Sequence, residues 1–170
     1  LESDVADSVN LAVTDLDGDG HLDVIVANQE RIPARVPPTH DRVCRGNGTG
    51  AFSCADVSAD ADRSTSLAVG DVDEDAAPDV VFSVQGTNRL CTGDGAGGLT
   101  CVAWPDIPSH AGDVALTDLN GDAHLDAVFT YSDAGVAARR CLGDGTGSFA
   151  CADVMGAVAT SGVAAGPLRR

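Results

Sequence analysis

Three segments of the chain carry aspartates at alternating positions, a spacing that suits a metal ion. Acids or amides stand at positions one, three and five of a short loop, with a further Asp at position nine. Alternate side chains of a tight loop point inward, and a carbonyl at position seven can complete the roughly six to eight oxygen ligands that Ca²⁺ prefers. The predicted ligands are Asp15, Asp17, Asp19, the His21 carbonyl and Asp23; Asp71, Asp73, Asp75, the Ala77 carbonyl and Asp79; and Asp118, Asn120, Asp122, the His124 carbonyl and Asp126.

The alternative interpretation is a set of solvated turn aspartates. Carboxylates crowded on one tight loop repel each other unless a cation neutralises them, and this arrangement recurs three times in register. We therefore expect three Ca²⁺ sites, which would offset six units of the formal charge of −16. Mg²⁺ fits less well because it keeps several waters and demands octahedral geometry. An EF-hand is excluded because no Glu stands at position twelve and no helix follows.

The three loops differ at two positions that should affect affinity. Position six is Gly20 in the first loop but Ala76 and Ala123 in the others, and glycine normally eases a sharp turn. Asn120 also replaces a carboxylate in the third loop. We expect unequal affinities, with the second or third loop the weakest.

The six cysteines form three pairs in one register, each pair flanking a Gly-rich turn. The repeat favours disulfides that staple each hairpin across facing strand positions. Zinc is the rival, but no Cys-x-x-Cys or nearby His supports it. Disulfides imply an oxidising compartment, so we expect a secreted, extracellular or cell-surface protein. The predicted disulfides are Cys44–Cys54, Cys91–Cys101 and Cys141–Cys151.

The acidic loops and cysteine pairs recur together with a period of about 50 residues. Each repeat alternates short β-branched runs with turns, which predicts strand, acidic loop, strand, linker, strand, Gly-rich turn and strand. Four antiparallel strands per unit are typical of a propeller blade, whereas a β-solenoid usually has a shorter period. We predict one all-β repeat domain over 1–170, an open-ended incomplete propeller with blades at about 8–55, 64–102 and 111–152.

The parts outside the repeats also resemble pieces of a blade. Residues 3–7 resemble the end of a repeat, such as residues 54–58, and residues 161–168 resemble the opening strand near 66–72. We expect 153–170 to supply the first strand of a further blade or a strand shared between subunits. Such open ends expose strand edges that invite pairing with another chain. The Pro-containing stretch from Arg31 to Arg42 is predicted to be a surface loop.

The acidic loop followed by a Gly-Asp-Gly-Thr-Gly-x-Phe turn, as at 143–149, resembles the FG-GAP/VCBS repeat of integrin-α-type propellers. The resemblance covers residues 8 to 154. It implies Ca²⁺-stabilised blades in secreted or cell-surface proteins with adhesion, matrix or carbohydrate-binding roles. Family propellers usually close with about seven blades, whereas three repeats are present here. The family does not fix a function, because its blades are scaffolds.

Composition and motifs exclude several classes of function. The net charge of −16 and pI of about 4.2 argue against nucleic acid and anionic membranes as partners. No apolar run approaches the roughly 20 residues of a membrane-spanning helix. His21, His40, His110 and His124 form no catalytic motif, so we do not expect an enzyme. Trp104 and Tyr131 are expected to pack in the core, and Asn47 matches a glycosylation sequon.

These observations favour an extracellular, calcium-stabilised structural or adhesive protein. We expect it to assemble with itself into an oligomer or filament through its open blade ends. The alternative is a fragment of a larger secreted propeller that binds carbohydrate or protein as an adhesion module. Its partners would then be glycans or cell-surface proteins.

Overall fold

A computed structural model describes residues 7–29, 40–58, 63–104, 107, 111–131 and 136–154. In these ranges twelve strands form three four-stranded antiparallel sheets, each built from consecutive strands. The first sheet, blade 1, contains β1 (Asp7–Thr14), β2 (Asp23–Gln29), β3 (Arg42–Gly46) and β4 (Phe52–Asp56). Blade 2 contains β5 (Ser64–Gly70), β6 (Asp79–Val84), β7 (Arg89–Gly93) and β8 (Leu99–Ala103). Blade 3 contains β9 (Ala111–Thr117), β10 (Asp126–Tyr131), β11 (Arg139–Gly143) and β12 (Phe149–Asp153).

The predicted all-β fold of three four-stranded antiparallel blades is confirmed. The predicted β-branched runs lie in β2, β6 and β10, the second strand of each blade. Most of the predicted loop between Arg31 and Arg42 lies outside the described residues, as does nearly all of the strand predicted over 153–170.

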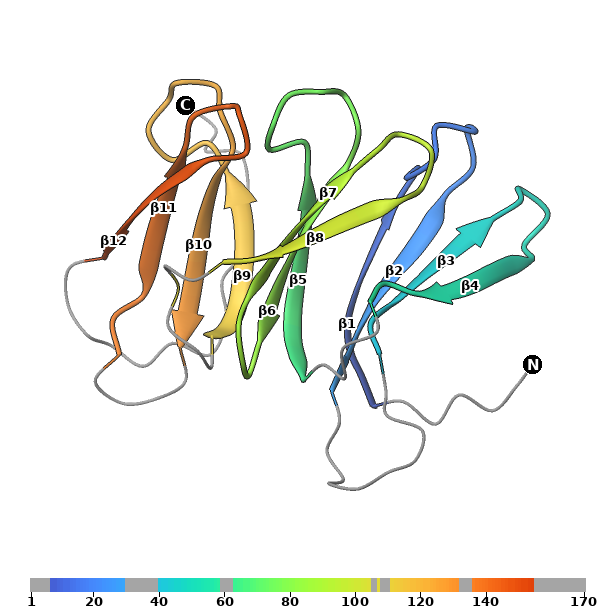
Figure 1. The fold of residues 1–170 in the computed structure, drawn as a ribbon, viewed down its shortest axis with the longest axis horizontal. Helices are drawn as coiled ribbons and strands as arrows, with labels where there is room; N and C mark the ends of the chain where they lie inside the picture. Colours follow the sequence, from blue (N-terminus) through green and yellow to red (C-terminus); the bar gives the residue numbers. More distant parts are fainter. Residues whose placement is uncertain are drawn as a thin grey trace, which may run out of the picture.

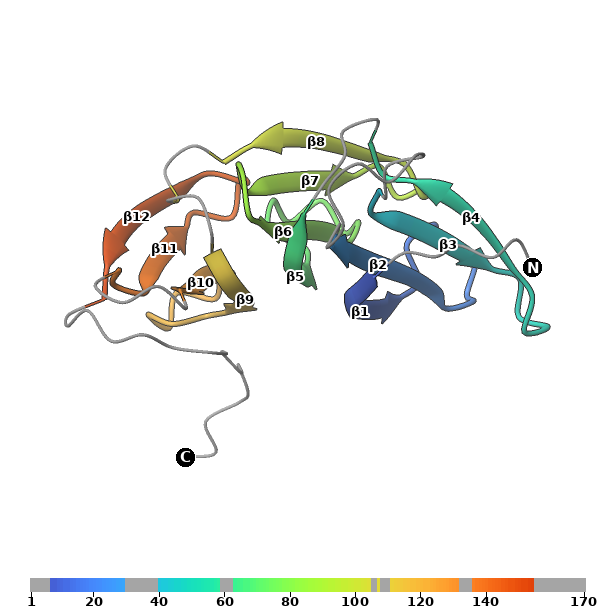
Figure 2. The same ribbon diagram turned by 90° about the horizontal axis from the view of Figure 1, so that it is seen from below.

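The three blades stand side by side in an arc (Figure 1, Figure 2). In Figure 2 the first strands, β1, β5 and β9, line the inner side of the arc, and the last strands, β4, β8 and β12, lie on the outer side. The pairing of the first two strands is irregular at the same place in every blade, between Ser8 and Asn10, between Ser64 and Ser66, and between Thr130 and Tyr131. The blades are therefore structural copies of one another.

The blades pack against one another face to face. We call the face turned toward lower residue numbers the N-side face and the opposite one the C-side face. Ile25 and Leu16 on the C-side face of blade 1 share a core with Phe82 and Val80 on the N-side face of blade 2. The C-side face of blade 2 and the N-side face of blade 3 form a second core. Because blade 2 is covered on both sides, every residue of β6 is buried.

In the part of the chain that the structure describes, the outer faces of the row have no such cover. Leu11, on the N-side face of blade 1, is 58% exposed, whereas its equivalents Leu67 and Val114 are 6% and 4% exposed. Leu119, on the C-side face of blade 3, is 46% exposed, whereas its equivalent Leu16 is 1% exposed. We call these two surfaces the open N-side face and the open C-side face.

Two of the aromatic side chains lie inside the core between blades 2 and 3, as the sequence predicts. Trp104 packs against Phe129 edge to face, with ring centroids 5.3 Å apart, and against Phe149 at 4.6 Å. Tyr131 is 1% exposed, and burial raises the pKa of its phenol to about 12. Neither Trp104 nor Tyr131 offers a ring to a ligand at the surface.

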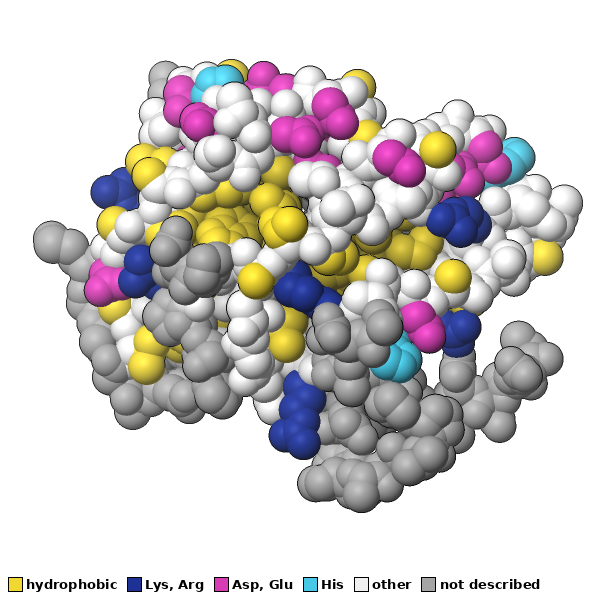
Figure 3. Space-filling model, viewed as in Figure 1, with side chains coloured by type: hydrophobic (Ala, Val, Ile, Leu, Met, Phe, Trp, Pro, Cys, Tyr) yellow, Lys and Arg dark blue, Asp and Glu magenta, His cyan; other side chains and the backbone are white. Residues whose placement is uncertain are grey.

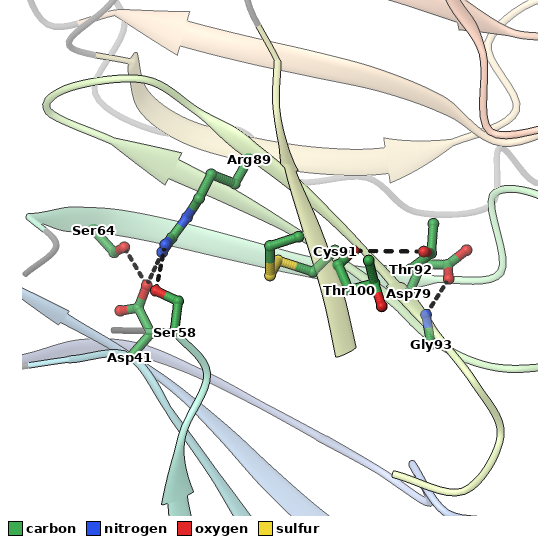
Figure 4. The surroundings of a disulfide bond; sticks show 10 residues. Asp41, Ser58, Ser64, Asp79, Arg89, Cys91, Thr92, Gly93 and Thr100 are labelled. Atoms are coloured by element: carbon green, nitrogen blue, oxygen red, sulfur yellow. Dashed lines mark hydrogen bonds and ion pairs between the residues drawn. A yellow bond between two sulfur atoms is a disulfide. The ribbon is translucent and has the colours of Figure 1, made fainter. Parts of the chain in front are cut away.

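A buried ion pair joins blades 1 and 2 (Figure 4). The Arg89 guanidinium lies 2.9 Å from the Asp41 carboxylate and donates a hydrogen bond of 2.8 Å to Ser58. The Ser64 hydroxyl and the backbone N–H of Asn28 also donate to Asp41, at 2.6 and 2.8 Å. Both charged side chains are nearly inaccessible, at 9% and 0% exposure. Good hydrogen bonding offsets the desolvation that such a pair incurs.

The equivalent arginines of the other blades pair within their own blade. Arg42 lies 3.5 Å from Asp56 and Arg139 lies 3.1 Å from Asp153, in each pair a cross-strand neighbour. The acids of these pairs are more than half exposed, so solvent screens both pairs.

All three acidic loops have the same backbone shape. Position six lies in the left-handed region in every loop, with φ of 86° at Gly20, 71° at Ala76 and 75° at Ala123. Position four is left-handed as well, at Gly18, Glu74 and Gly121. A left-handed conformation costs an L-residue about 1–2 kcal/mol, so the second and third loops carry strain that the first avoids.

We predict that Asp41→Ala lowers the free energy of unfolding by about 3–5 kcal/mol, because it removes the buried carboxylate that Arg89, Ser64 and the backbone N–H of Asn28 all bind. The matched control is Asp153→Ala, which removes the exposed partner of Arg139 and should cost at most about 1 kcal/mol. Urea denaturation measures both values. Equal losses for the two variants would contradict the role given to the buried pair.

Exchanging residues at position six should change stability in opposite directions. We predict that Ala76→Gly stabilises the protein by about 1 kcal/mol and that Gly20→Ala destabilises it by a similar amount. An alanine at Gly20 meets no neighbouring atom within 4 Å, so only backbone strain is added. Ala96→Gly is the control, because Ala96 is exposed and is not among the positive-φ residues; this glycine should destabilise. A loss for Ala76→Gly in urea denaturation would refute the strain argument.

Candidate metal sites in the acidic loops

The three acidic loops lie at one edge of the molecule. They connect β1 to β2, β5 to β6 and β9 to β10, and in Figure 1 these connections all lie at the upper ends of the blades. Acidic side chains gather along this edge in Figure 3. The repeat therefore places three similar sets of carboxylates in a row.

The aspartate at position nine has a structural role in every loop. Asp23, Asp79 and Asp126 are completely buried. One oxygen of each accepts a hydrogen bond of 2.8–2.9 Å from the backbone N–H at position two of its loop. The other accepts one of 2.8–2.9 Å from a glycine at the end of the third strand (Figure 4 for Asp79). This carboxylate thus ties the acidic loop to the third strand of its blade.

The glycines that donate to these aspartates are Gly46, Gly93 and Gly143. Our sequence interpretation placed them at the Gly-rich turns and did not predict this role. A Cβ atom at any of them would lie 2.2–2.3 Å from the backbone carbonyl oxygen at position eight of the loop. No other residue allows this approach without a backbone shift. The signal in the sequence is a glycine two residues after the first cysteine of all three pairs.

Positions one and five shape the loop itself. The position-one carboxylates, in Asp15, Asp71 and Asp118, accept the backbone N–H of position six at 2.9–3.1 Å. The position-five carboxylates accept the N–H of position seven at 2.8–3.0 Å. Position seven is His21, Ala77 or His124, and the sequence predicts that the backbone carbonyl of this residue binds the metal ion. These bonds curl each loop around its own acidic side chains.

The first two loops also gather carboxylates that lack enough hydrogen-bond donors. Ligand oxygens of Asp15, Asp17 and Asp19 lie within 4.8 Å of one another, as do those of Asp71, Asp73 and Asp79. The Oδ1 atoms of Asp15 and Asp73 are buried and accept no hydrogen bond. An unpaired buried carboxylate oxygen is costly. A hard cation would satisfy it, so the donor set fits Ca²⁺.

The electrostatics of the second loop agree with this fit. Burial raises the pKa of the Asp79 carboxyl above its ordinary value, and the charges of Asp73 and Asp75 add to the effect. The backbone N–H groups of Gly93 and Val72 oppose it. Without a positive charge nearby, this carboxylate is ionised at a cost.

The third loop is built differently. The Asn120 amide donates a hydrogen bond of 2.8 Å to Asp122, so an N–H group takes a place where the other loops have only oxygens. The pKa of Asp122 is lowered, chiefly by the N–H of His124 and then by Asn120. In the described part of the chain, this loop forms no cluster of three acids like those of the first two. The third loop therefore needs a cation least.

The second and third loops contact each other directly. The Glu74 carboxylate lies 2.5 Å from Nδ1 of His124, and this hydrogen bond is the main cause that raises the pKa of the imidazole. Glu74 stands at position four of its loop, where the other two loops have glycine. Nothing in the sequence predicts its partner. This contact links a loop of blade 2 with a loop of blade 3.

The three predicted disulfides are present as Cys44–Cys54, Cys91–Cys101 and Cys141–Cys151. Each joins directly paired residues of the third and fourth strands. Cys91 and Cys141 are fully buried in the two cores between blades, whereas Cys44 on the open N-side face is only partly buried.

The sequon residue Asn47 lies in an exposed turn and accepts hydrogen bonds from Thr49; its glycosylation stays a prediction.

Comparison with known proteins agrees with this architecture. The chain is similar to an Agrocybe aegerita lectin whose structure addresses specific recognition of non-reducing terminal N-acetylglucosamine. The two share 20% identity with a TM-score of 0.52, over 84% of this chain and 37% of the lectin chain. At this identity the likeness concerns the fold alone, and this chain spans little more than a third of the lectin's length. No curated protein matches the sequence.

The described residues contain no helix long and apolar enough to cross a membrane.

Residues 15–82 match the family model described as an FG-GAP-like repeat. This match begins at Asp15, position one of the first acidic loop, and extends through the second loop into β6. Residues 15–82 are therefore of the FG-GAP repeat type.

Proposed function

We propose that the protein is an extracellular, calcium-stabilised structural or adhesive protein that associates with copies of itself through its open blade faces. Its role is binding rather than catalysis. One observation carries the proposal: apolar residues on the two outer faces are exposed although their equivalents inside the row are buried. Exposed apolar side chains that gather on one face mark an interaction surface.

Calcium stabilisation rests on the loops. The buried, unpaired oxygens of Asp15 and Asp73 lie in clusters of three carboxylates. The residues that would hold the ion are the predicted ligands of each loop, with the position-nine aspartate fixed by two backbone N–H groups. A bound ion would supply positive charge that relieves the repulsion among these side chains.

The compartment is inferred from the disulfides. Three of them occur in a chain that has no unpaired cysteine among its described residues. Such bridges persist outside the cell or in another oxidising compartment.

Calcium should raise the melting temperature and bind at three sites, most weakly at the third loop. A site adds about 2.7 kcal/mol of stability when Ca²⁺ is 100-fold above its Kd. We predict that Asp73→Asn weakens the second site about tenfold and that Asn120→Asp strengthens the third, because ligand charge sets affinity. Titration calorimetry after chelation measures both.

The control for the calcium titration is Asp94→Asn, in a Gly-rich turn outside the acidic loops. Asp94 accepts the N–H groups of Ala96 and Gly98, bonds that asparagine can also accept, so its titration should match that of the unmodified protein. Identical melting curves in Ca²⁺ and in EGTA would refute calcium stabilisation.

Self-association is tested by the mass of the native protein in light scattering, together with negative-stain images. We expect ordered assemblies in millimolar Ca²⁺ that dissociate at least partly in excess EGTA. Ions bound in the acidic loops would hold the edges of the blades in place, and chelation would remove this support. Monomers in both conditions would refute self-association.

The second candidate is a module of a larger propeller that binds glycans. It is favoured by the likeness in fold to a lectin chain of which this chain spans 37%. Because Trp104 and Tyr131 are buried, sugar stacking on these rings cannot be the means of binding. Binding of the isolated chain to a glycan array that includes terminal N-acetylglucosamine would favour this candidate.

A further inference from the structure

We propose that the open C-side face of blade 3 docks onto the open N-side face of blade 1 of a second copy, head to tail. The contact would repeat the way blade 3 follows blade 2 within the chain. The inference rests on the proposed function, because it names the surfaces and the pairing by which copies associate. The two faces lie at opposite ends of the row (Figure 1, Figure 2).

The apolar side chains of the two open faces are those that bury each other inside the row. On the C-side face, Val128 is only partly buried although its equivalents Ile25 and Val81 are 0% exposed. Val154 is 40% exposed, whereas its equivalent Trp104 is 7% exposed. On the N-side face the exposed members are Leu11, Val13, Leu22 and Phe52. Contact between the two faces would bury these side chains, as their equivalents are buried between blades inside the row.

The charges at the existing interfaces indicate which faces match. Between blades 1 and 2, the arginine of the following blade, Arg89, pairs with Asp41 of the preceding blade. The cross-strand neighbour of Arg89 within its own blade is Ala103, which brings no acid. Among the described residues, the acid that pairs with Arg89 thus comes from across the interface.

Between blades 2 and 3 the acid comes from the other side. Asn88 stands in blade 2 where Asp41 stands in blade 1, so this position is neutral. In blade 3, Arg139 has the acid Asp153 as its cross-strand partner at 3.1 Å. Among the described residues, Arg89 thus pairs with an acid of the preceding blade and Arg139 with an acid of its own blade.

The two open faces match the pattern found between blades 2 and 3, in which the arginine pairs with an acid of its own blade. Blade 1 brings Arg42 together with its own Asp56, at 3.5 Å. It therefore suits a preceding blade that is neutral at the Asp41 position. Blade 3 has Ala138 at that position, so the C-side face of a second copy meets the requirement. This charge match is the reason to choose a second copy as the occupant.

The inner strands give a second, independent match. Asn10 of β1 donates its amide N–H to Ser66 of β5 at 2.9 Å, and Ser66 donates to the carboxylate of Asp113 in β9. These three residues are equivalent in the repeat, so each blade bonds the next at this position. Continuing the series from blade 3 brings the Asp113 carboxylate to an Asn10 amide of a second copy, an acceptor beside a donor.

A head-to-tail contact is heterologous, so blocking either face gives a decisive mixing experiment. Leu11→Glu blocks the N-side face and Val128→Glu blocks the C-side face, with Val154→Glu as a second C-side variant that does not touch a central strand. The control is Val102→Glu on β8, an exposed valine (56%) of blade 2 that lies on neither open face. Circular dichroism in Ca²⁺ checks that each variant is folded.

We expect each blocked variant to remain monomeric at concentrations at which the unmodified protein and Val102→Glu assemble. An equimolar mixture of Leu11→Glu and Val128→Glu should stop at a mixed dimer, because only one open face of each kind remains. Light scattering and ultracentrifugation distinguish these species. A blocked variant that still assembles, or that forms a dimer by itself, would overturn the head-to-tail pairing while leaving self-association intact. An unmodified protein that stays monomeric would overturn the proposed function as well.

The charge match is tested separately. Ala138→Asp would place a second acid against Arg42 and Asp56 of the neighbouring copy, and we expect it to weaken association about tenfold or more. Adding Asp56→Ala in the same chain should restore association, since the interface then follows the pattern of blades 1 and 2. Unchanged association for Ala138→Asp, or no recovery in the double variant, would overturn the proposed contact.

Discussion

A blade of this kind has two apolar faces, and each must be covered by another blade. Phe82 and Val81 are neighbours in β6, yet they lie in different cores because successive side chains of a strand point to opposite faces. The core of the protein therefore lies between sheets rather than within one, and it grows only when a blade is added. The disulfides stiffen single blades. The buried ion pair joins one blade to the next.

The buried aspartate at position nine is what makes a blade rigid enough to be stacked. Asp79 accepts one backbone N–H from its own loop and one from Gly93, so it fixes the end of β7 relative to β6. The disulfide Cys91–Cys101 then fixes β8 to β7. With aromatic residues at 4% of the composition, little apolar area is available per residue, and these polar and covalent ties compensate for a thin core.

Sequence reasoning predicted the blades, the acidic loops and the cysteine pairing, because each is a local pattern repeated three times. It did not predict the contacts that pass between blades. Asp41 and Arg89 lie in different repeats. The cross-strand neighbour of Arg89 is Ala103, where the other repeats have the acids Asp56 and Asp153. The role of Gly93 was missed because the close carbonyl, that of Pro78, is brought to it only by the fold. Differences between the repeats, rather than their common pattern, specify the interfaces.

The acidic loops and the interfaces are physically coupled, because the loops form part of the edges that meet. The backbone N–H of Gly147, in the turn of blade 3, donates to the carbonyl of Val72, which is position two of the second loop. Glu74 of the same loop bonds to His124 of the next. A cation that holds Asp71 and Asp73 together would fix both contacts at once. Ion binding in one blade would thus favour the correct seating of the next, whether that blade belongs to the same chain or to a second copy.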